Sequence, residues 1–272
     1  MEVPIYNRYI ENYSNRISKL FEEIDKFEEA IQNIDIYEDF AIDSKKLAIK
    51  ELKNEIIKYI QYNNGSLGFD IVLIKCMLKE LLGYSYILIG EKLSEEEINT
   101  CDLEIDVRIY FFLNCIYNFR GKLKELFRIE YCKKEKNYIM NDNNILKNPV
   151  IILDLLKVFF NKINKYCEAR NKIVHHIYEI KLDKVENKIN IFISKFNLSK
   201  DSIFNKNKNY PEEITLKDLE LIEVVVEMQK IRKNIIEFLL DVENNINTEE
   251  LKNKFKKEKG YSFLNDGILF KN

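Results

Sequence analysis

The stretch that decides the fold is residues 149–178, which read PVIILDLLKVFFNKINKYCEARNKIVHHIY. Up to Cys167 its apolar residues return every three or four positions, the spacing of one face of a helix. Proline is tolerated in a first turn, so Pro149 predicts where this helix begins. The helix runs towards Arg170, and the chain's two histidines, His175 and His176, follow at its expected end. A helical scaffold therefore leads directly into the residues best suited to chemistry.

The composition of the whole chain also favours helices. Of 272 residues only 7 are Gly and 3 are Pro, whereas all-β folds need turn residues about every 8–12 positions. Hydrophobic residues make up 46% of the chain, which is typical of a globular protein with a core. The sequence therefore predicts a mainly all-α fold.

Helical spacing recurs along the chain and is interrupted by polar segments. It predicts helices over residues 10–34, 44–62, 69–89, 103–132, 149–174 and 216–242, with loops over 63–66, 133–148 and 199–211. Ser94 with Glu97 has the form of a capping box before the fourth helix, and Thr215 with Asp218 resembles an N-cap pair before the last.

Strict alternation replaces helical spacing after His176. Apolar residues occupy every second position over 178–182 and again over 189–193. The polar residues between Val185 and Lys188 suit a turn, so the segment predicts a small β-hairpin.

Several functional classes are excluded by what the sequence lacks. The five cysteines form no C-x-x-C pair, which favours reduced, buried thiols in a cytosolic protein. Glu168 with His175 and His176 is too small a set for a metal site. Neither G-x-G nor G-K-[ST] occurs, so no phosphate-binding glycine loop is expected. We therefore expect no cofactor.

Charge and hydropathy limit the possible partners. The net charge of −2 argues against a protein that coats nucleic acid indiscriminately, although it allows a local basic groove. The apolar segment 69–89 contains Lys75, Lys79 and Glu80, which favours a buried helix over a membrane span. The first residues lack the pattern of a signal peptide. We therefore expect a cytoplasmic protein without a membrane partner.

Residues 166–178 combine a permanent cation with groups that exchange protons near neutral pH. Arginine offers a planar fork suited to phosphate oxygens, and imidazole can act as an acid or a base. On a continuous helix, however, His175 lies about 140° around the axis from Arg170, and His176 about 120° the other way. The groups converge only if the helix ends near Val174 or if a second subunit completes the site. Asn171, four residues before His175, is placed to orient that ring.

The alternative to catalysis is a structural role for the same residues. Histidines are favoured at a helix C-terminus by the helix dipole, and Arg170 could form a surface ion pair. Another basic set, Arg120, Lys124 and Arg128, recurs at intervals of four on the predicted helix 103–132. It predicts either a solvated charged face or a track that faces phosphate groups.

Arg170-Asn171 followed by His175 resembles the R-x4–6-H motif of the HEPN superfamily, which usually has a polar residue after the Arg. In that family the motif lies near the end of a long helix in an all-α bundle. The resemblance covers residues 103–176 and the helix expected from Leu216. It implies a HEPN-like domain over 96–245 with its motif at 170–176. The sequence adds N-terminal helices over 1–95 that we expect to pack on this core, and a basic C-terminal helix and tail over 246–272.

The resemblance implies a metal-independent endoribonuclease, often a toxin or an abortive-infection effector in antiphage defence. HEPN proteins typically form homodimers in which two motif copies face each other, which would meet the geometric difficulty. Carried over, His175 is the general acid or base, Arg170 stabilises the transition state and Asn171 assists. Attack by the ribose 2′-OH then leaves a 2′,3′-cyclic phosphate, so the substrate is RNA.

His176 and Tyr178 form an H-x-Y pattern that resembles HEPN toxins paired with nucleotidyltransferase antitoxins. In those toxins the tyrosine can be modified, which makes Tyr178 a possible modification site and an antitoxin a possible partner. The alternative is a strand residue that packs its ring. Two further functions stay open: a catalytically inactive HEPN-like module that binds RNA, a nucleotide or a protein, and a purely structural protein.

Overall fold

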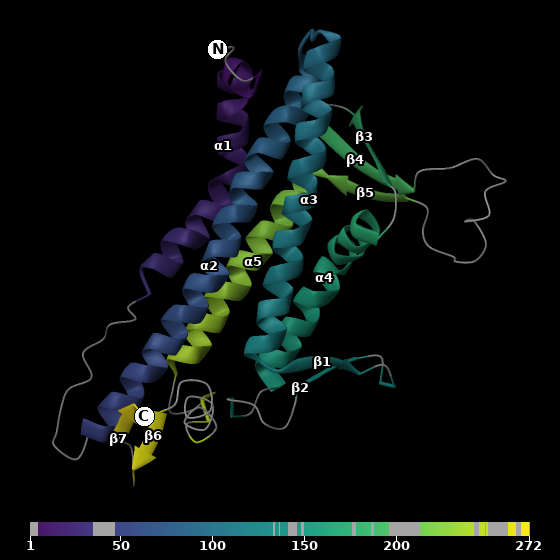
Figure 1. The fold of residues 1–272 in the computed structure, drawn as a ribbon. Coiled ribbons are helices and arrows are strands. Elements are labelled where there is room, and N and C mark those ends of the chain that lie inside the picture. The colour runs from purple at the N-terminus through teal and green to yellow at the C-terminus, as the bar shows by residue number, and fades with distance from the viewer. Residues whose placement is uncertain are drawn as a thin grey trace. The chain divides into compact units, whose positions relative to one another are not determined.

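Helices dominate the computed structural model, which describes residues 5–34, 47–132, 134–135, 137–140, 146–147, 150–175, 178–185, 188–195, 213–241, 245–247, 249, 261–264 and 268–271. The described helices are α1 (Ile5–Gln32), α2 (Leu47–Gly90), α3 (Glu95–Leu126), α4 (Val150–His175) and α5 (Asp218–Leu240) (Figure 1). The prediction of a mainly helical fold is confirmed. No described helix has both the length and the apolar character needed to cross a bilayer.

The chain divides into two compact units, and every helix contributes to both. The first comprises Met1–Asp25, Asp70–Asn118 and Asn161–Met228, and the second Lys26–Phe69, Phe119–Phe160 and Gln229–Asn272. Each unit therefore draws on segments from along the whole chain. The three consecutive regions predicted from the sequence stay a prediction.

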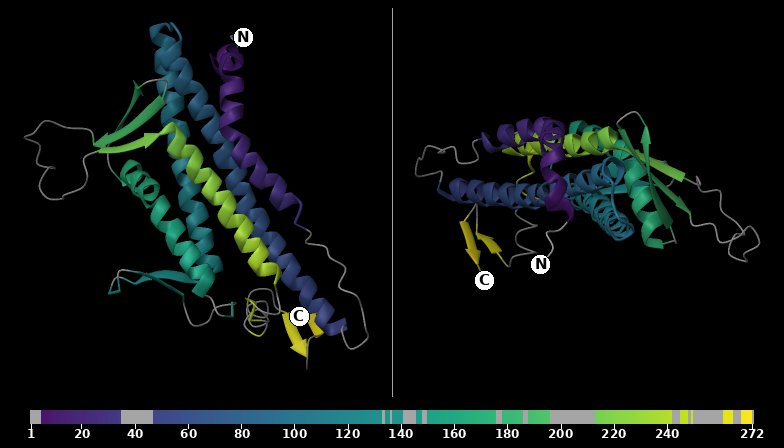
Figure 2. Two further views of the ribbon diagram at one scale, coloured as in Figure 1. Left: turned by 180° about the vertical axis from the view of Figure 1, so that it is seen from behind. Right: turned by 90° about the horizontal axis from the view of Figure 1, so that it is seen from above.

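Large apolar side chains from several helices fill each core. In the first unit Ile71, Ile74 and Leu78 of α2 and Phe112 of α3 are buried, and in the second Phe119 of α3 packs edge-on against Phe159 of α4. Helices α2 and α5 run side by side in both views of Figure 2. Their contacts include Tyr86 with Asp218 in the first unit and Asn64 with Arg232 in the second.

The contact of α1 with α2 in the first unit depends on two glycines of α2. The ring of Tyr6 lies where a Cβ on Gly83 would stand. The hydroxyl of Tyr13 lies where a Cβ on Gly90 would stand. The rings of Tyr6 and Tyr13 also contact those of Tyr84 and Tyr86. Absence of a side chain at these glycines is what lets the two helices approach.

The predicted hairpin after the motif is confirmed. Strand β3 (Tyr178–Val185) pairs antiparallel with β4 (Lys188–Lys195), with Val185 opposite Lys188. A third strand, β5 (Glu213–Lys217), pairs with the other edge of β4 and was not predicted. Because β5 includes Thr215 and Leu216, the predicted helix start at Leu216 is wrong, and α5 begins at Asp218.

The predicted loop over 63–66 is also wrong, because α2 continues through it as one helix. One of its polar groups bonds within the helix, and two find partners that only the fold supplies. Asn63 donates to the carbonyl of Tyr59 (2.8 Å), Asn64 accepts from Nε of Arg232 (2.6 Å), and the carbonyl of Ser66 accepts from Nζ of Lys122 (3.1 Å). Tertiary contacts therefore override a local preference for a loop.

Helix α3 starts earlier and ends earlier than predicted. The capping box is confirmed, since the amide of Glu97 donates to Oγ of Ser94 (3.3 Å) and the amide of Ser94 to Oε2 of Glu97 (2.9 Å). The helix thus begins at Glu95. It ends at Leu126, and Arg128 then takes a left-handed conformation (φ 50°).

The chain past Arg128 forms a short hairpin of β1 (Ile129–Cys132) and β2 (Asn137–Met140). The prediction of a loop over 133–148 is therefore wrong for residues 137–140. Strands β6 (Tyr261–Leu264) and β7 (Ile268–Lys271) form a further pair. Pro149, the loop 199–211 and the Lys-rich segment 252–259 lie outside the described residues.

Candidate active site

Arg170 is held by neutral groups of α3 and α4. Its Nε donates to Oδ1 of Asn114 (3.0 Å), and its Nη1 donates to Oδ1 of Asn171 (3.2 Å). Its guanidinium carbon lies 4.4 Å from the centre of the Tyr117 ring, a cation–π contact. No described carboxylate forms an ion pair with Arg170. The side chain is therefore positioned while its charge remains uncompensated by these neighbours.

The segment before Arg170 is anchored firmly against α5. The hydroxyl of Tyr166 donates to the carbonyl of Glu220 (2.9 Å), and Nζ of Lys165 donates to the carboxylate of the same residue (2.5 Å). Burial raises the pKa of Tyr166 well above its usual value, with smaller contributions from Glu220 and Glu223. A fixed turn of helix therefore carries Arg170.

The two predicted histidines are placed only in part. His175 is the last residue of α4, so its backbone is described but its side chain is not, and His176 lies outside the described residues. Since α4 remains helical to His175, positions 170 and 175 are about 140° apart around its axis. The observed end of α4 at His175 is one residue beyond the predicted end near Val174, and within the helix the two positions do not share a face.

Tyr178, the proposed modification site, opens β3 and is half-buried. It pairs with Lys195 across the hairpin. This position in a paired strand favours the alternative, in which Tyr178 is a strand residue with a structural role.

Two residues that contact Arg170 were not predicted from the sequence. Asn114 and Tyr117 belong to an apolar run of α3, and only their contacts with Arg170 reveal a role. The single signal for Asn114 is a polar residue within the run 111–117. Lys172 is buried, and this burial lowers its pKa while Glu168 opposes the shift.

The predicted basic track contacts protein groups instead of forming one face. Arg120 donates to the hydroxyl of Tyr138 on β2 and lies over the Phe160 ring. Lys124 lies 5.1 Å from the centre of the Tyr138 ring. Arg128 follows the end of α3, so the expectation that all three share one helix face is wrong. Whether they contact RNA stays a prediction.

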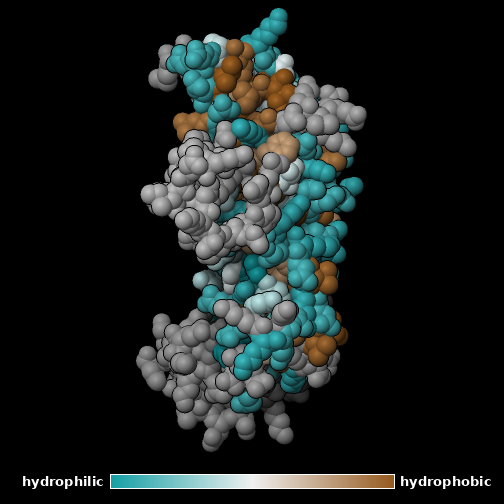
Figure 3. Space-filling model, turned by 90° about the vertical axis from the view of Figure 1, so that its right-hand side faces the viewer, coloured by the Kyte–Doolittle hydropathy of each residue, from teal (hydrophilic) through white to brown (hydrophobic). Residues whose placement is uncertain are grey.

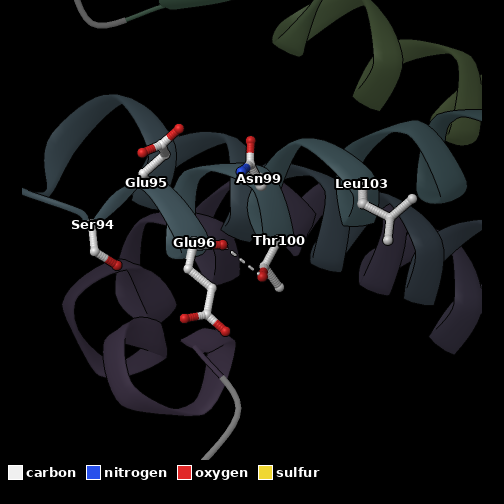
Figure 4. A pocket seen from close by; sticks show the side chains of 6 residues that line it. All are labelled: Ser94, Glu95, Glu96, Asn99, Thr100 and Leu103. Carbon is white, nitrogen blue, oxygen red and sulfur yellow. Dashed lines mark hydrogen bonds between the residues drawn. The ribbon is translucent and has the colours of Figure 1, made fainter.

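A shallow surface pocket lies at the start of α3, away from Arg170. Ser94, Glu95, Glu96, Asn99, Thr100 and Leu103 line it (Figure 4). Its charged groups are carboxylates, and the Thr100 hydroxyl is bonded to the carbonyl of Glu96 (2.9 Å). An acidic lining does not suit a nucleic acid backbone, so we do not assign the active site here.

The described residues offer little for a metal. They contain no cluster of three His, Cys, Asp or Glu side chains arranged to hold an ion. All five cysteines are free. Cys101, Cys115 and Cys167 are buried, as predicted, whereas the prediction is wrong for exposed Cys76 and half-buried Cys132. Burial raises the pKa of Cys101 to about 11, which makes it a poor nucleophile.

No protein-family model matches the chain, and no similar protein was found among the curated proteins or the solved structures. Function is therefore inferred from the residues themselves.

Proposed function

We propose that the protein is a metal-independent endoribonuclease of HEPN type that acts as a homodimer in the cytoplasm, as a toxin or an antiphage effector. The observation that carries this proposal is the environment of Arg170. An amide on each side and an aromatic face hold its guanidinium, and no described carboxylate neutralises it. Such a cation suits a phosphate that gains negative charge in the transition state.

The proposed chemistry needs only side chains. The 2′-oxygen of the ribose attacks the neighbouring phosphorus, the bond to the 5′-oxygen breaks, and a 2′,3′-cyclic phosphate forms. His175 takes the proton from the 2′-OH or gives one to the leaving 5′-oxygen, and solvent water exchanges the other proton. Arg170 stabilises the charge on the phosphoryl oxygens, and Asn171, already bonded to Arg170, keeps that fork oriented.

A homodimer is part of the proposal because of helix geometry. Positions 170 and 175 lie on different sides of α4. A two-fold axis near the end of α4 would place the Arg170 of one copy beside the His175 of another.

The test is RNA cleavage in the presence of EDTA. The wild-type chain should release fragments with 2′,3′-cyclic phosphate ends, whereas Arg170→Ala and His175→Ala should lose activity by at least about a hundredfold. His176→Ala should keep most of it. The control is Lys233→Ala, which removes a cation whose only described ion pair is with Glu237 on α5. Cleavage that survives in His175→Ala, or that needs a metal, contradicts the proposal.

A second candidate is a catalytically inactive HEPN-like module that binds RNA, a nucleotide or a partner protein. The same half-buried cation favours it, because Arg170 can bind a phosphate without any histidine. It predicts RNA binding that Arg170→Ala weakens and His175→Ala leaves unchanged, with no cleavage. A purely structural protein would show neither binding nor cleavage.

Regulation by a nucleotidyltransferase antitoxin stays a minor proposal. It predicts an AMP group on Tyr178 after co-expression with such an enzyme. An unmodified Tyr178 under those conditions contradicts it.

A further inference from the structure

Helix α3 exposes three aromatic rings around Asn114, the residue that accepts a hydrogen bond from Arg170. Tyr110 and Phe111 lie four and three residues before Asn114, and Tyr117 lies three residues after it. Residues three or four apart are neighbours on a helix surface, so the rings surround position 114. We call Tyr110, Phe111 and Tyr117 the aromatic row. Their side chains are 38%, 50% and 39% exposed. The aromatic row and Arg170 belong to the same compact unit.

The contacts of the rings leave flat aromatic surface available. Tyr110 and Phe111 meet edge to face with their centres 5.6 Å apart, so at least one face of each ring is not covered by the other. Hydrophobic side chains gather near the end of the molecule where α2 meets α3 (Figure 3). Exposed apolar surface of this kind marks an interaction site. Exposed rings beside a cation are the combination by which proteins bind unpaired nucleotides, since bases stack on the rings while the cation holds the backbone.

Arg170 supplies the cation at one end of the aromatic row. Its guanidinium lies against the ring of Tyr117, as described above. Its Nε and Nη1 donate to Asn114 and Asn171, whereas no described residue accepts a hydrogen bond from Nη2. Nη2 can therefore donate to a phosphate oxygen. A phosphate held there has the aromatic row directly beside it.

Acidic residues limit how far a nucleic acid can extend along α3. Exposed Asp106 and Asp102 lie four and eight residues before Tyr110, and their carboxylates repel phosphates. The usable length therefore runs from Tyr110 to Tyr117, which is two turns of helix or about 10 Å. At the spacing of roughly 3.4 Å per nucleotide in one strand, this length matches about three nucleotides.

We infer that the aromatic row of α3 stacks unpaired bases of single-stranded RNA and presents the adjacent phosphate to Arg170. Tyr110 and Phe111 determine this specificity, because a base inside a duplex is stacked and paired and has no free face to offer. The inference rests on the proposed function, since it names the class of RNA that the Arg170 site cleaves.

The first test measures the binding of a labelled 2′-O-methyl RNA strand of about eight nucleotides by fluorescence anisotropy. This strand has no free 2′-OH, so the proposed reaction cannot cleave it. Tyr110→Ala and Phe111→Ala should each raise Kd about tenfold, the effect of losing one stacked base. Tyr110→Phe should bind like the wild type because it keeps the ring. The matched control is Phe69→Ala on α2, which removes a 61% exposed phenylalanine outside the aromatic row and should leave Kd unchanged.

The second test asks whether the bases make the contact. The same strand with abasic units should bind the wild type about tenfold more weakly, and so should a duplex of the same sequence. Tyr110→Ala and Phe111→Ala should weaken neither of these further. Circular dichroism checks that each variant keeps its helices.

Two results would overturn the inference. One is binding of the single strand that both alanine variants leave unchanged, including the case in which they alter only the mass in solution and thereby reveal a protein interface. The other is an equal loss of binding for the single strand, the duplex and the abasic strand, which would show that the aromatic row does not stack bases.

These measurements need no catalysis, so they separate the two proposals. Base-dependent binding without cleavage of ordinary RNA supports the aromatic row and contradicts the ribonuclease. Cleavage that is equal for single strands and duplexes, and that both alanine variants retain in full, does the reverse.

Discussion

The described partners of Arg170 are two amides and a ring, so none of them neutralises its charge. An ion pair would hold the side chain equally well but would compete with a phosphate for the guanidinium. Asn114 and Tyr117 therefore act as positioning residues: they fix a cation that must contact the substrate.

Replacing Asn114 by Ala should lower kcat about tenfold or more and change KM little, since a hydrogen bond to a charged group contributes about 1.5–3 kcal/mol. The measurement is steady-state RNA cleavage. Adding the change to Arg170→Ala should cause no further loss, because both act through one guanidinium. The control is Asn164→Ala, whose amide is bonded to Glu168 (2.6 Å). Independent, additive losses would refute the positioning role.

Two glycines of α2 should respond oppositely to the same change. A Cβ on Gly68 would stand 2.8 Å from Nη2 of buried Arg232, whereas Gly65 has nothing within 4 Å. Gly68→Ala should therefore lower the free energy of unfolding by about 1–3 kcal/mol through overpacking. Gly65→Ala should raise it by about 0.5–1 kcal/mol, because alanine favours the helix. Urea denaturation measures both, and equal effects would contradict the packing around Arg232.

The start of α3 should weaken in acid because of its capping box. The hydrogen bonds from Ser94, first the backbone and then the side chain, lower the pKa of Glu97 below its usual 4.5, and Arg8 adds to this. The stabilisation is therefore present above pH 4.5 and is lost as the pH falls through the folded-state pKa.

Thermal melts of wild type and Glu97→Ala test this expectation. The wild type should melt higher at pH 7, and the difference should shrink below pH 4.5. Glu95→Ala, in the same first turn, should have a smaller effect. A difference that does not depend on pH would contradict the assigned contact.

Elements with strong local patterns were predictable, and those fixed by distant partners were not. Helix α1, helix α4, the capping box and the hairpin of β3 and β4 follow from periodicity and turn residues. The continuity of α2 depends on Arg232 and Lys122, which lie far along the chain. Strand β5 is short and exists because the edge of β4 offers it hydrogen bonds. A short segment of sequence shows neither the distant partners of α2 nor the strand that β5 pairs with.

The candidate site was predictable to a similar extent. Residue type and spacing were enough to single out Arg170, Asn171 and His175. Asn114 and Tyr117 are more than fifty residues away in sequence, and they reach Arg170 only because α3 and α4 pack together.

Buried tyrosines should make the molecule sensitive to alkali. Burial is the main cause that raises the pKa of Tyr6 and of Tyr86 to about 12, from an ordinary value of 10.0. Between pH 10 and about 12 the unfolded chain releases these protons and the folded chain keeps them. Stability should therefore fall as the pH rises through this window.

Urea midpoints from pH 8 to pH 12 check this, with Tyr6→Phe as the comparison. The Tyr6 hydroxyl is buried without a hydrogen bond to any described residue, so the change removes an ionisable group at little cost. The alkaline decline should be shallower in the variant. An identical decline would show that Tyr6 does not titrate as stated.

The fit of Tyr6 against Gly83 and of Tyr13 against Gly90 has a consequence for how the sequence can diverge. Neither member of such a pair can change freely, because any side chain at the glycine occupies the space of the ring. Substitutions at these positions should therefore be correlated between related sequences. A relative with alanine or serine at the position of Gly83 should carry a residue smaller than tyrosine at the position of Tyr6, and the same covariation should link positions 90 and 13.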